Sequence, residues 1–330
     1  MMAHGGGGRL MAQLIEQMFA GAFRELGLQA TTDAAELDVD HSRIAFTTDS
    51  FVVSPRQFPG GNIGSLAVHG TVNDLAVSGA RPLYLSLGMI LEEGLPMEEL
   101  WSIVQSIASA AHDAEVQIVT GDTKVVDRGH GDGIFINTSG IGVLDRDIEL
   151  GPAQIRPGDS IIVSGDLGRH GIAIMATREG LTFDAGIESD SAPIVREVRA
   201  LLDAGIEVHC MRDLTRGGLA SALNELAGVA DLGMHIEESK MPVRDEVSGA
   251  CEMLGLDPLY LANEGRFVAI VAATDTELAL DLLAGIAIDT APAVIGSVEE
   301  TPRKTVLQLS AIGATRIVDL LSGEQLPRIC

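Results

Sequence analysis

The sequence of 330 residues is poor in aromatic and basic side chains. Phe, Trp and Tyr make up 3% of it, and 22 Lys and Arg stand against 47 Asp and Glu, so the net charge is −25. A chain this acidic repels the phosphate backbone of nucleic acids and offers few rings on which bases could stack. We therefore expect no nucleic-acid partner. An anionic ligand would have to be held by metal ions, backbone N–H groups or a few well-placed cations.

Long apolar runs are also missing. The best run, FVAIVAA, has the length of a strand and not that of a membrane-spanning helix. The first residues, MMAHGGGGRL, contain no apolar signal-peptide core. We expect a cytoplasmic protein with no membrane segment.

Cysteine is rare, with Cys210, Cys251 and Cys330 only. No CxxC pair or Cys/His cluster predicts zinc, and a reducing compartment requires no disulfide. Cys210 and Cys251 lie in apolar surroundings that are typical of buried thiols. Cys330 is the last residue and does not match a prenylation signal. It is either a chance residue at a tolerant position or a reactive thiol.

The length and the mixture of helix-like and strand-like segments predict an α/β (α+β) protein of two domains. The loop-like stretch IELGPAQIRPGDS, rich in Pro and Gly, places the boundary near residue 151. We predict a Gly-rich arm and helix over 1–40, a first domain over 41–150, a second domain over 151–321 and a flexible tail over 322–330.

Four lone carboxylates end strand-like segments or begin helix-like ones, and they are Asp49, Asp74, Asp122 and Asp213. Any one of them could be a helix cap or a turn residue. Together they favour magnesium bound beside a nucleotide, with Asp49, Asp74 and Asp122 as metal ligands. Neighbouring glycines would let backbone N–H groups approach phosphate oxygens closely.

Lys124 is one of three lysines and follows Asp122 by two residues, in a segment that we predict to be a loop. It could be an ordinary surface lysine. In so acidic a chain, we interpret it as a partner of a phosphate or of a leaving group. The sequence has neither a GxxxxGK[ST] nor a GxGxxG motif.

Five segments in this order resemble the PurM-like ATP-dependent superfamily: TTDSFVV, GGNIGSLAVHGTVNDLAVSGARP, VTGDTKVV, MRDLTRGGLA and ANEGR. The leading HGGGGRLM and the final PRIC resemble those of the HypE family of hydrogenase maturation factors. The resemblance implies a PurM-like two-domain fold, a homodimer formed through the first domain, and Mg²⁺ and ATP between the domains. The implied nucleotide-binding residues are Asp49, Asp74, Asp122, Asp213, Thr215, Gly217 and Gly218.

The resemblance also implies that Cys330 is a carrier. A carbamoyltransferase of the HypF type would load its sulfur with a carbamoyl group, and this protein would use ATP to dehydrate that group to a thiocyanate. The cyanide would pass to iron on a HypC–HypD type scaffold, for a [NiFe] hydrogenase. Lys124 would assist phosphoryl transfer, and Glu264 would be the base, with His69 as the second choice. Glu264 could instead orient the Asn263 loop, and His69 could be a capping or core residue.

Two other functions remain open from the sequence. The chain could be another PurM-like ATP-dependent kinase or ligase that acts on a small molecule. It could also be a non-enzymatic adaptor that uses its tail as a docking peptide. In the carrier interpretation we expect a tail that buries little surface, with Ser322 and Gly323 as a hinge and Pro327 as a stiff approach.

Overall fold

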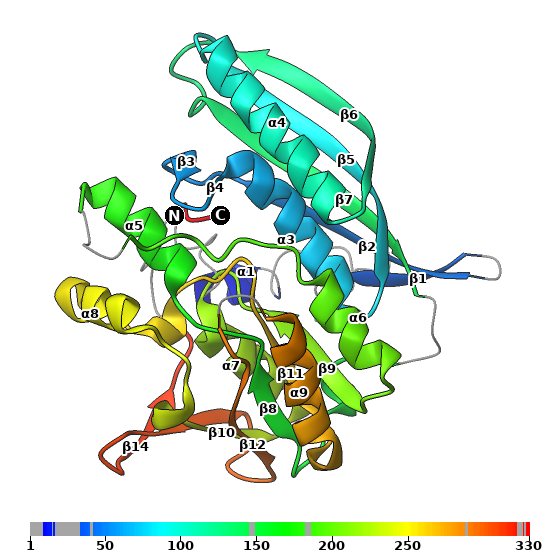
Figure 1. Ribbon diagram of the computed structural model, residues 1–330, viewed down its shortest axis with the longest axis vertical. Coiled ribbons are helices and arrows are strands. Elements are labelled where there is room, and N and C mark those ends of the chain that lie inside the picture. The colour runs from blue at the N-terminus through cyan, green and yellow to red at the C-terminus, as the bar shows by residue number, and fades with distance from the viewer. Residues whose placement is uncertain are drawn as a thin grey trace.

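Two β-sheets with helices packed against them make up most of the described chain (Figure 1). The computed structural model describes residues 9–14, 16, 34–39, 42–144, 149–181, 186–287, 290–321, 326 and 328–330. Within these residues no helix is both long and apolar enough to cross a bilayer. Of the helix that we predicted near the start, the described part is α1 (Arg9–Leu14).

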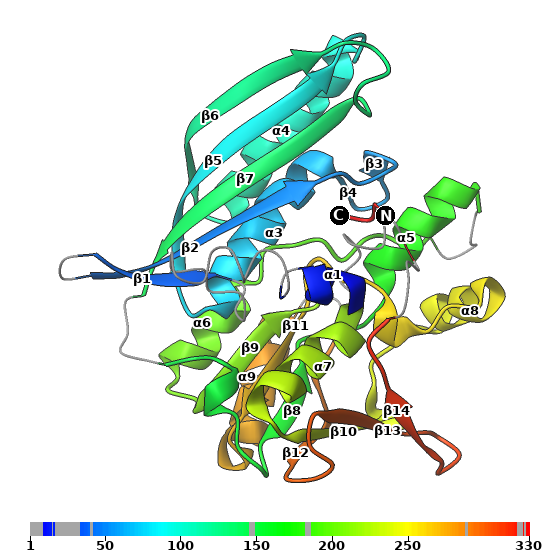
Figure 2. The same cartoon turned by 180° about the vertical axis from the view of Figure 1, so that it is seen from behind.

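The first sheet has five strands in the order β1-β2-β7-β5-β6. Strands β5 and β6 are parallel, and the other neighbours are antiparallel. Helices α3 and α4 cover one face, whereas Figure 2 shows the opposite face of β5, β6 and β7 with no described helix over it. The bounds are β1 Ala35–Val39, β2 Ser42–Phe51, α3 Ile63–Val77, β5 Arg81–Glu92, α4 Met97–Asp113, β6 Gln117–Val126 and β7 Ile134–Val143, with a small hairpin of β3 Gln57–Phe58 and β4 Gly61–Asn62.

Helix α3 is buried on nearly all sides, which explains its many small residues. Asn62 caps it by accepting hydrogen bonds from the N–H groups of Gly64 and Ser65, and Ser65 bonds back to the Asn62 N–H. A Cβ on Gly70 would lie 2.9 Å from the Phe51 ring, so glycine lets the helix approach β2 closely. This close approach brings residues of α3 next to residues of β2.

The second sheet has seven strands in the order β14-β13-β10-β12-β8-β11-β9. Helix α7 packs on one face, and α6 and α9 pack on the other. Helices α5 and α8 pack against each other beside this sheet. The bounds are β8 Ser160–Val163, α5 Arg169–Glu179, α6 Val195–Asp203, β9 Val208–Asp213, α7 Gly218–Ala230, β10 Gly233–Glu237, α8 Asp245–Leu254, β11 Phe267–Val271, α9 Thr276–Ile286, β12 Ala293–Glu299, β13 Thr305–Leu309 and β14 Thr315–Val318, with 3₁₀ turns at Pro152–Gln154, Glu238–Lys240, Pro258–Tyr260 and Ala273–Asp275.

The two halves meet around α3. Ala76 and Val77 of α3 pack with α6 and with the second sheet, and Ile174 of α5 packs in the core of the first half. The predicted boundary near residue 151 falls between the end of β7 and the start of β8. Side chains at the end of β2 and in the loops of the second sheet can therefore face one another.

One local prediction is wrong. The segment that includes Asp122 and Lys124 is not a loop, because it continues strand β6 to Val126 and pairs with β5 along its length. Gly121, Asp122 and Lys124 are weak strand formers, and they are held in the strand by this long-range pairing.

Candidate active site

The last residues of the chain lie against the end of β2. The N–H of Val52 donates to the Cys330 carbonyl oxygen at 3.1 Å, and the N–H of Ser54 donates to the Arg328 carbonyl oxygen at 3.0 Å. Ile329 is 5% exposed and belongs to the hydrophobic core of the first half. In both views the chain end lies near β4 and α5 (Figures 1 and 2).

Our prediction that the tail buries little surface is therefore wrong for its last residues. Besides burying Ile329, the tail is tied by Arg328, whose Nε donates to the Val52 carbonyl oxygen at 3.1 Å and whose guanidinium pairs with Asp132. These contacts are long-range and could not be inferred from the tail sequence. The predicted hinge and stiffening residues, Ser322, Gly323 and Pro327, lie outside the described part of the chain.

The thiol of Cys330 lies near four charged groups, of which Asp213 and Glu264 are buried. Burial raises its pKa far above the ordinary value, and the positive charge of Arg216 opposes that effect. The negative charges of Glu264, Asp49 and Asp213 raise the pKa further. These effects favour the neutral thiol, and they place three carboxyl groups and one guanidinium within electrostatic reach of the sulfur.

Arg216 reaches this cluster from the turn between β9 and α7. Its guanidinium lies 3.8 Å from the Asp49 carboxylate, and the acidic groups around it raise its pKa despite burial. Gly217 and Gly218 have φ values of 77° and 58°, which favour glycine. The motif MRDLTRGGLA contains Arg216, but we did not predict it as a site residue. A cation next to a lone carboxylate in so acidic a chain was the available signal.

The same turn places two other predicted residues. Asp213, the last residue of β9, is 7% exposed and close enough to Glu264 to raise its pKa. The carbonyl oxygen of Thr215 accepts a hydrogen bond from the Gly218 N–H at 2.9 Å, which closes the turn. A Cβ on Gly218 would lie 2.4 Å from the Leu261 carbonyl oxygen, so only glycine fits there.

Glu264 is a buried carboxyl group with an oxygen available for chemistry. It is 2% exposed, and its Oε1 has no hydrogen-bond partner among the described residues. Burial raises its pKa well above the usual range, and the charges of Asp213, Asp49 and Asp190 raise it further. A buried carboxyl group with a raised pKa that also acts on the Cys330 thiol has the properties expected of a general acid or base.

The loop that carries Glu264 is held by other side chains. Asn263 is fully buried, and its Oδ1 accepts from the Gly168 N–H at 2.7 Å while its amide donates to the Leu261 carbonyl at 3.0 Å. The Glu264 N–H donates to Asp190 at 3.2 Å. Asn263 and Asp190 therefore hold the loop through their own hydrogen bonds, and a structural role for the Glu264 carboxyl group stays the alternative to a catalytic one.

Asp49 and Asp74 face each other across the contact between β2 and α3. Thr47 of β2 donates to Asp74 at 2.9 Å, and Asp49 lies two residues further along the same face. Burial raises the pKa of Asp49, and the charge of Arg216 partly offsets this. Both carboxyl groups also act on Arg216. Two of the three predicted metal ligands thus lie on neighbouring elements and both act on Arg216.

Asp122 and Lys124 do not join them within one chain. Ser50, Asn137, Gly88 and Asp122 are paired in one row across the sheet, so Asp122 points to the face opposite Asp49. Strand β6 is three strands from β2, about 14 Å away. Asp122 and Lys124 form an exposed ion pair with 2.6 Å between their charged atoms. The predicted three-carboxylate metal site is therefore not formed within one chain, and with Asp122 supplied by a second chain it stays a prediction.

The described residues contain no group of three or more His, Cys, Asp or Glu side chains arranged to hold a metal. Mg²⁺ is usually bound in proteins by one or two carboxylates together with phosphate oxygens. The pair Asp49 and Asp74 fits that donor set, since it supplies two hard oxygen ligands and leaves the remaining positions to a nucleotide.

His69 lies on α3 and is 8% exposed. Its Nδ1 is 3.0 Å from the hydroxyl oxygen of Ser191, and burial lowers its pKa to about 4. The imidazole is therefore neutral near pH 7 and already has a hydrogen-bond partner. These features are also those of a core histidine, the alternative that sequence analysis left open.

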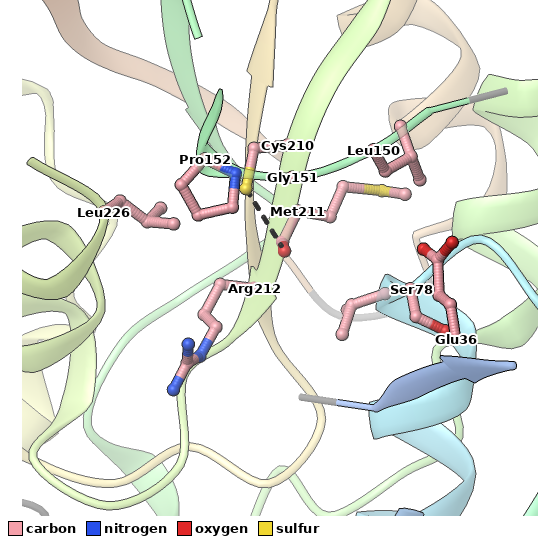
Figure 3. Close-up of a pocket in the computed structure, with 10 residues that line it drawn as sticks. Glu36, Ser78, Leu150, Gly151, Pro152, Cys210, Met211, Arg212 and Leu226 are labelled. Atoms are coloured by element: carbon pink, nitrogen blue, oxygen red, sulfur yellow. Dashed lines mark hydrogen bonds between the residues drawn. The ribbon is translucent and has the colours of Figure 1, made fainter. Parts of the chain in front are cut away.

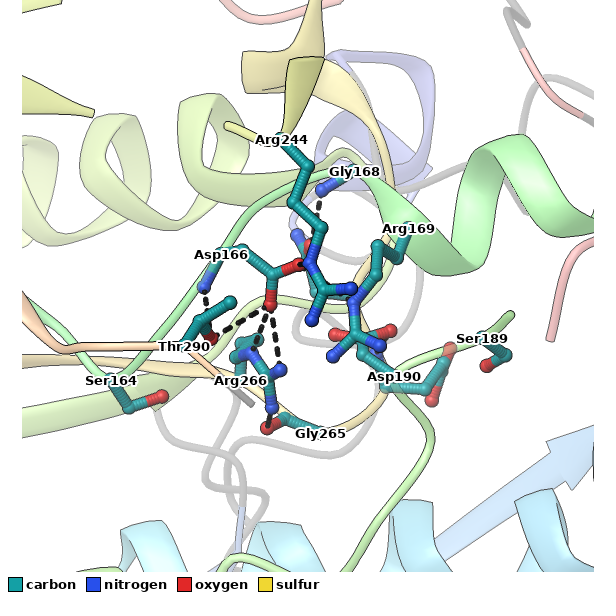
Figure 4. A network of polar contacts seen from close by, with 12 residues as sticks. Ser164, Asp166, Gly168, Arg169, Ser189, Asp190, Arg244, Gly265, Arg266 and Thr290 are labelled. Carbon is teal, nitrogen blue, oxygen red and sulfur yellow. Dashed lines mark hydrogen bonds and ion pairs between the residues drawn. The ribbon is translucent and has the colours of Figure 1, made fainter. Parts of the chain in front are cut away.

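A second polar network is centred on Asp166 and includes Arg266, which lies in the loop that carries Glu264 (Figure 4). Asp166 is 1% exposed and forms ion pairs with Arg169, Arg244 and Arg266 at 2.7 to 2.9 Å. Burial opposes its ionisation, but the three guanidinium groups outweigh burial and lower the pKa of Asp166. Arg266 follows Glu264 by two residues, so this network anchors the loop and was not identified from the sequence.

The other two cysteines are structural. Cys210 and Cys251 are 2% and 3% exposed, as predicted. Cys210 donates to the Met211 carbonyl oxygen and lines a small pocket with Leu150, Pro152 and Leu226 (Figure 3). Burial raises the pKa of Cys251 to about 11.

Comparison with known proteins identifies related chains. The AIR synthase related protein N-terminal domain matches residues 31–144, and the corresponding C-terminal domain matches residues 156–308. Carbamoyl dehydratase HypE of Azotobacter vinelandii is 51% identical over 100% of this chain and 96% of its own length. Carbamoyl dehydratase HypE of Escherichia coli (strain K12) is 46% identical over 100% of this chain and 98% of its own length.

Solved structures agree with this result. A HypE–HypF complex has a TM-score of 0.88 at 45% identity, covering 93% of this chain and 99% of that chain. HypE in complex with ATP has a TM-score of 0.84 at 45% identity, covering 100% of this chain and 99% of that chain. The predicted two-domain fold of the PurM-like superfamily is confirmed.

Proposed function

The chain belongs to the HypE family of carbamoyl dehydratases, and we propose on that basis that it uses ATP to dehydrate a carbamoyl group on its own Cys330. The product is a thiocyanate, whose cyanide is donated to the iron of a [NiFe] hydrogenase during maturation. The observation that carries this proposal in the structure is the position of Cys330, docked beside Glu264 and Arg216.

The proposed reaction has two steps, a phosphorylation and an elimination. First the carbamoyl oxygen attacks the γ-phosphorus of ATP, ADP leaves, and one proton is lost from nitrogen. Then the C–O bond breaks, phosphate leaves, the second proton is lost, and the C≡N bond forms. Phosphoryl transfer depends mainly on positioning and charge neutralisation, and the departure of phosphate depends on a base at nitrogen.

We assign these tasks to residues near the thiol. Glu264 takes protons from nitrogen, because its carboxyl group is buried next to the thiol and its raised pKa makes it a stronger base than an ordinary carboxylate. Arg216 stabilises negative charge on the oxygen that receives the phosphoryl group. Asp213, Thr215, Gly217 and Gly218 form the turn that presents Arg216 and faces the nucleotide.

ATP is the cofactor, and a relative has been solved with ATP bound. We propose that Asp49 and Asp74 bind the accompanying Mg²⁺, which would neutralise charge on the phosphates. Partial burial would strengthen the attraction of Asp49 for a divalent cation, whereas the positive charge of Arg216 would oppose it, so phosphate oxygens would have to supply the remaining ligands.

We further propose that the protein works as a homodimer. Phe46, Ile141 and Tyr84 are paired in one row on the helix-free face of the first sheet and are 37% to 43% exposed. Such a face is usually covered by another protein surface. A second copy on this face would meet Asp122 and Lys124, which point in the same direction, so these two residues would serve the site of the partner copy.

A solved relative is a HypE–HypF complex. We propose that a HypF-type carbamoyltransferase loads Cys330 and that a HypC–HypD type scaffold receives the cyanide, all in the cytoplasm. We expect both exchanges to require the tail to leave its docked position, since Ile329 beside the thiol is buried and bonded there.

The test is the intact mass of the carbamoylated protein before and after ATP. The proposal expects the mass to fall by that of one water molecule, with ADP and phosphate released. A kinase for a small molecule or an adaptor would leave the mass of the carbamoylated chain unchanged, and that result would overturn the proposal.

A further inference from the structure

We propose that His170 is the residue that seats the tail, and that through Ser189 it links the docked tail to the loop that supports Glu264. His170 lies on α5 and is fully buried. Its Nε2 is 2.6 Å from the Ile329 carbonyl oxygen. A carbonyl oxygen only accepts, so Nε2 carries the proton and donates it.

The three carbonyl groups at the end of the tail accept hydrogen bonds from two kinds of donor, backbone N–H groups and the His170 side chain. The Arg328 and Cys330 carbonyls accept from the N–H groups of Ser54 and Val52, whereas the Ile329 carbonyl turns inward to His170. Loss of the donor would leave the Ile329 carbonyl buried without a partner, which destabilises the docked position. Ile329 and Cys330 are adjacent, so this bond fixes the backbone next to the sulfur.

The other side of the imidazole faces Ser189. Neutral Nδ1 accepts from the Ser189 hydroxyl at 2.8 Å, and the ring packs edge-on against Phe58 with 5.5 Å between centroids. Burial lowers the pKa of His170, which favours this neutral form. The Ser189 N–H donates to the Pro59 carbonyl, and its hydroxyl oxygen accepts from the Ser191 N–H.

Asp190 follows Ser189 in sequence and contacts Glu264, the residue that we propose as the base. Asp190 accepts from the Glu264 N–H at 3.2 Å, and the Ala192 N–H donates to the Glu264 carbonyl at 3.4 Å. A chain of hydrogen bonds therefore runs from the Ile329 carbonyl through His170 and Ser189 to the loop of Glu264. His170 is a positioning residue, because it acts on the thiol and on the base through these neighbours.

Docking is tested without any enzymatic step. The rate of alkylation of Cys330 by iodoacetamide is measured by mass spectrometry of the C-terminal peptide, with buried Cys210 and Cys251 as internal references. His170→Met removes the donor, and we expect alkylation about ten-fold faster, as for one buried hydrogen bond lost. His170→Gln restores an N–H near the Nε2 position, and we expect a rate close to that of the wild type.

The effect on turnover rests on the proposed function and is measured separately. We expect His170→Met to slow single-turnover dehydration of the carbamoylated protein about ten-fold, with little change in the KM for ATP, and His170→Gln to restore the rate. His112→Met, at an exposed histidine of α4, is the matched control and should leave both rates unchanged.

Ser189→Ala covers the case in which His170→Met does not fold. It removes the partner that orients the imidazole, and we expect faster alkylation of Cys330. Equal alkylation rates in the wild type, His170→Met and Ser189→Ala would overturn the inference, as would equal defects in His170→Met and His170→Gln. Failure of the wild type itself to form thiocyanate would count against the proposed function and leave the alkylation result standing.

Discussion

Glu264 is the residue to which we assign the proton transfers of the dehydration. We expect Glu264→Gln to bind ATP normally, since it keeps the shape and hydrogen-bonding capacity of the side chain. It cannot accept a proton, so dehydration should slow by about 10²–10⁴-fold. The measurement is single-turnover conversion of the carbamoylated protein by mass.

Glu197 provides the matched control for that variant. Burial also raises the pKa of Glu197, but it lies on α6 and is not among the charged groups that act on the Cys330 thiol. Glu197→Gln should therefore convert the carbamoyl group at the wild-type rate. A wild-type rate in Glu264→Gln would remove the base role from Glu264 and pass it to His69.

The same carboxyl group should lower the stability of the protein as pH rises. Its pKa is raised in the folded state, so the folded protein holds the proton more tightly than the unfolded chain does. Below the ordinary carboxyl pKa both states are protonated and Glu264 makes no pH-dependent contribution. Above it the unfolded state ionises first, and the free energy of unfolding falls until the folded pKa is passed.

In Glu264→Gln this fall in the free energy of unfolding with rising pH is absent. We expect the stability of the variant, relative to the wild type, to increase from about pH 4.5 upward and then level off. Urea unfolding at a series of pH values measures the difference. A constant difference across this range would show that the pKa of Glu264 is not raised.

At the scale of elements, the turn between β9 and α7 determines where Arg216 points. Gly218→Ala places a Cβ 2.4 Å from the Leu261 carbonyl oxygen at a φ of 58°, so we expect a loss of about 2 kcal/mol or more. Gly228→Ala in the same helix meets no atom within 4 Å, and a gain of about 0.5–1 kcal/mol is expected. Denaturant unfolding of both variants makes the comparison. Equal effects would contradict this description of the turn.

Sequence patterns predicted α3, α4 and most strands because apolar residues recur there at helical or strand spacing. They failed at residues 121–126, where a strand is exposed along nearly its whole length and has no alternation of buried and exposed positions. Its pairing with β5 is long-range, and no local pattern reports it. Asp122 was consequently placed with Asp49, although the two point to opposite faces.

The tail shows the same limit. Cys330 was predicted as the carrier from its resemblance to a family. Its docked position depends on hydrogen bonds that the tail accepts from Val52, Ser54 and His170, which are more than 150 residues away in sequence. Hydrogen bonds between such distant segments have no signature in either segment alone.

In the proposed homodimer we expect each active site to be shared by the two chains. A heterodimer of one Lys124→Ala chain and one Glu264→Gln chain would contain one site with both residues intact if Lys124 acts on the partner copy. We expect such a heterodimer, made by co-expression with two tags, to convert the carbamoyl group on the Lys124→Ala chain. Homodimers of either variant should be impaired.

If Lys124 acts within its own chain, neither site of the heterodimer would be intact, and activity would stay as low as in the two homodimers. A wild-type protein that sediments as a monomer would contradict shared sites altogether. The position of Lys124 on the helix-free face of the first sheet favours the shared arrangement.

We propose that the thiol of Cys330 carries the group that becomes cyanide. The most direct measurement is to load the protein with a ¹³C-labelled carbamoyl group, add ATP, and follow the infrared absorption of a nitrile while mapping the label to peptides. The account predicts a ¹³C-nitrile on the peptide that ends at Cys330 and none in Cys330→Ser. A nitrile on the Cys210 or Cys251 peptide, or a label on Cys330 that never becomes a nitrile, would contradict it.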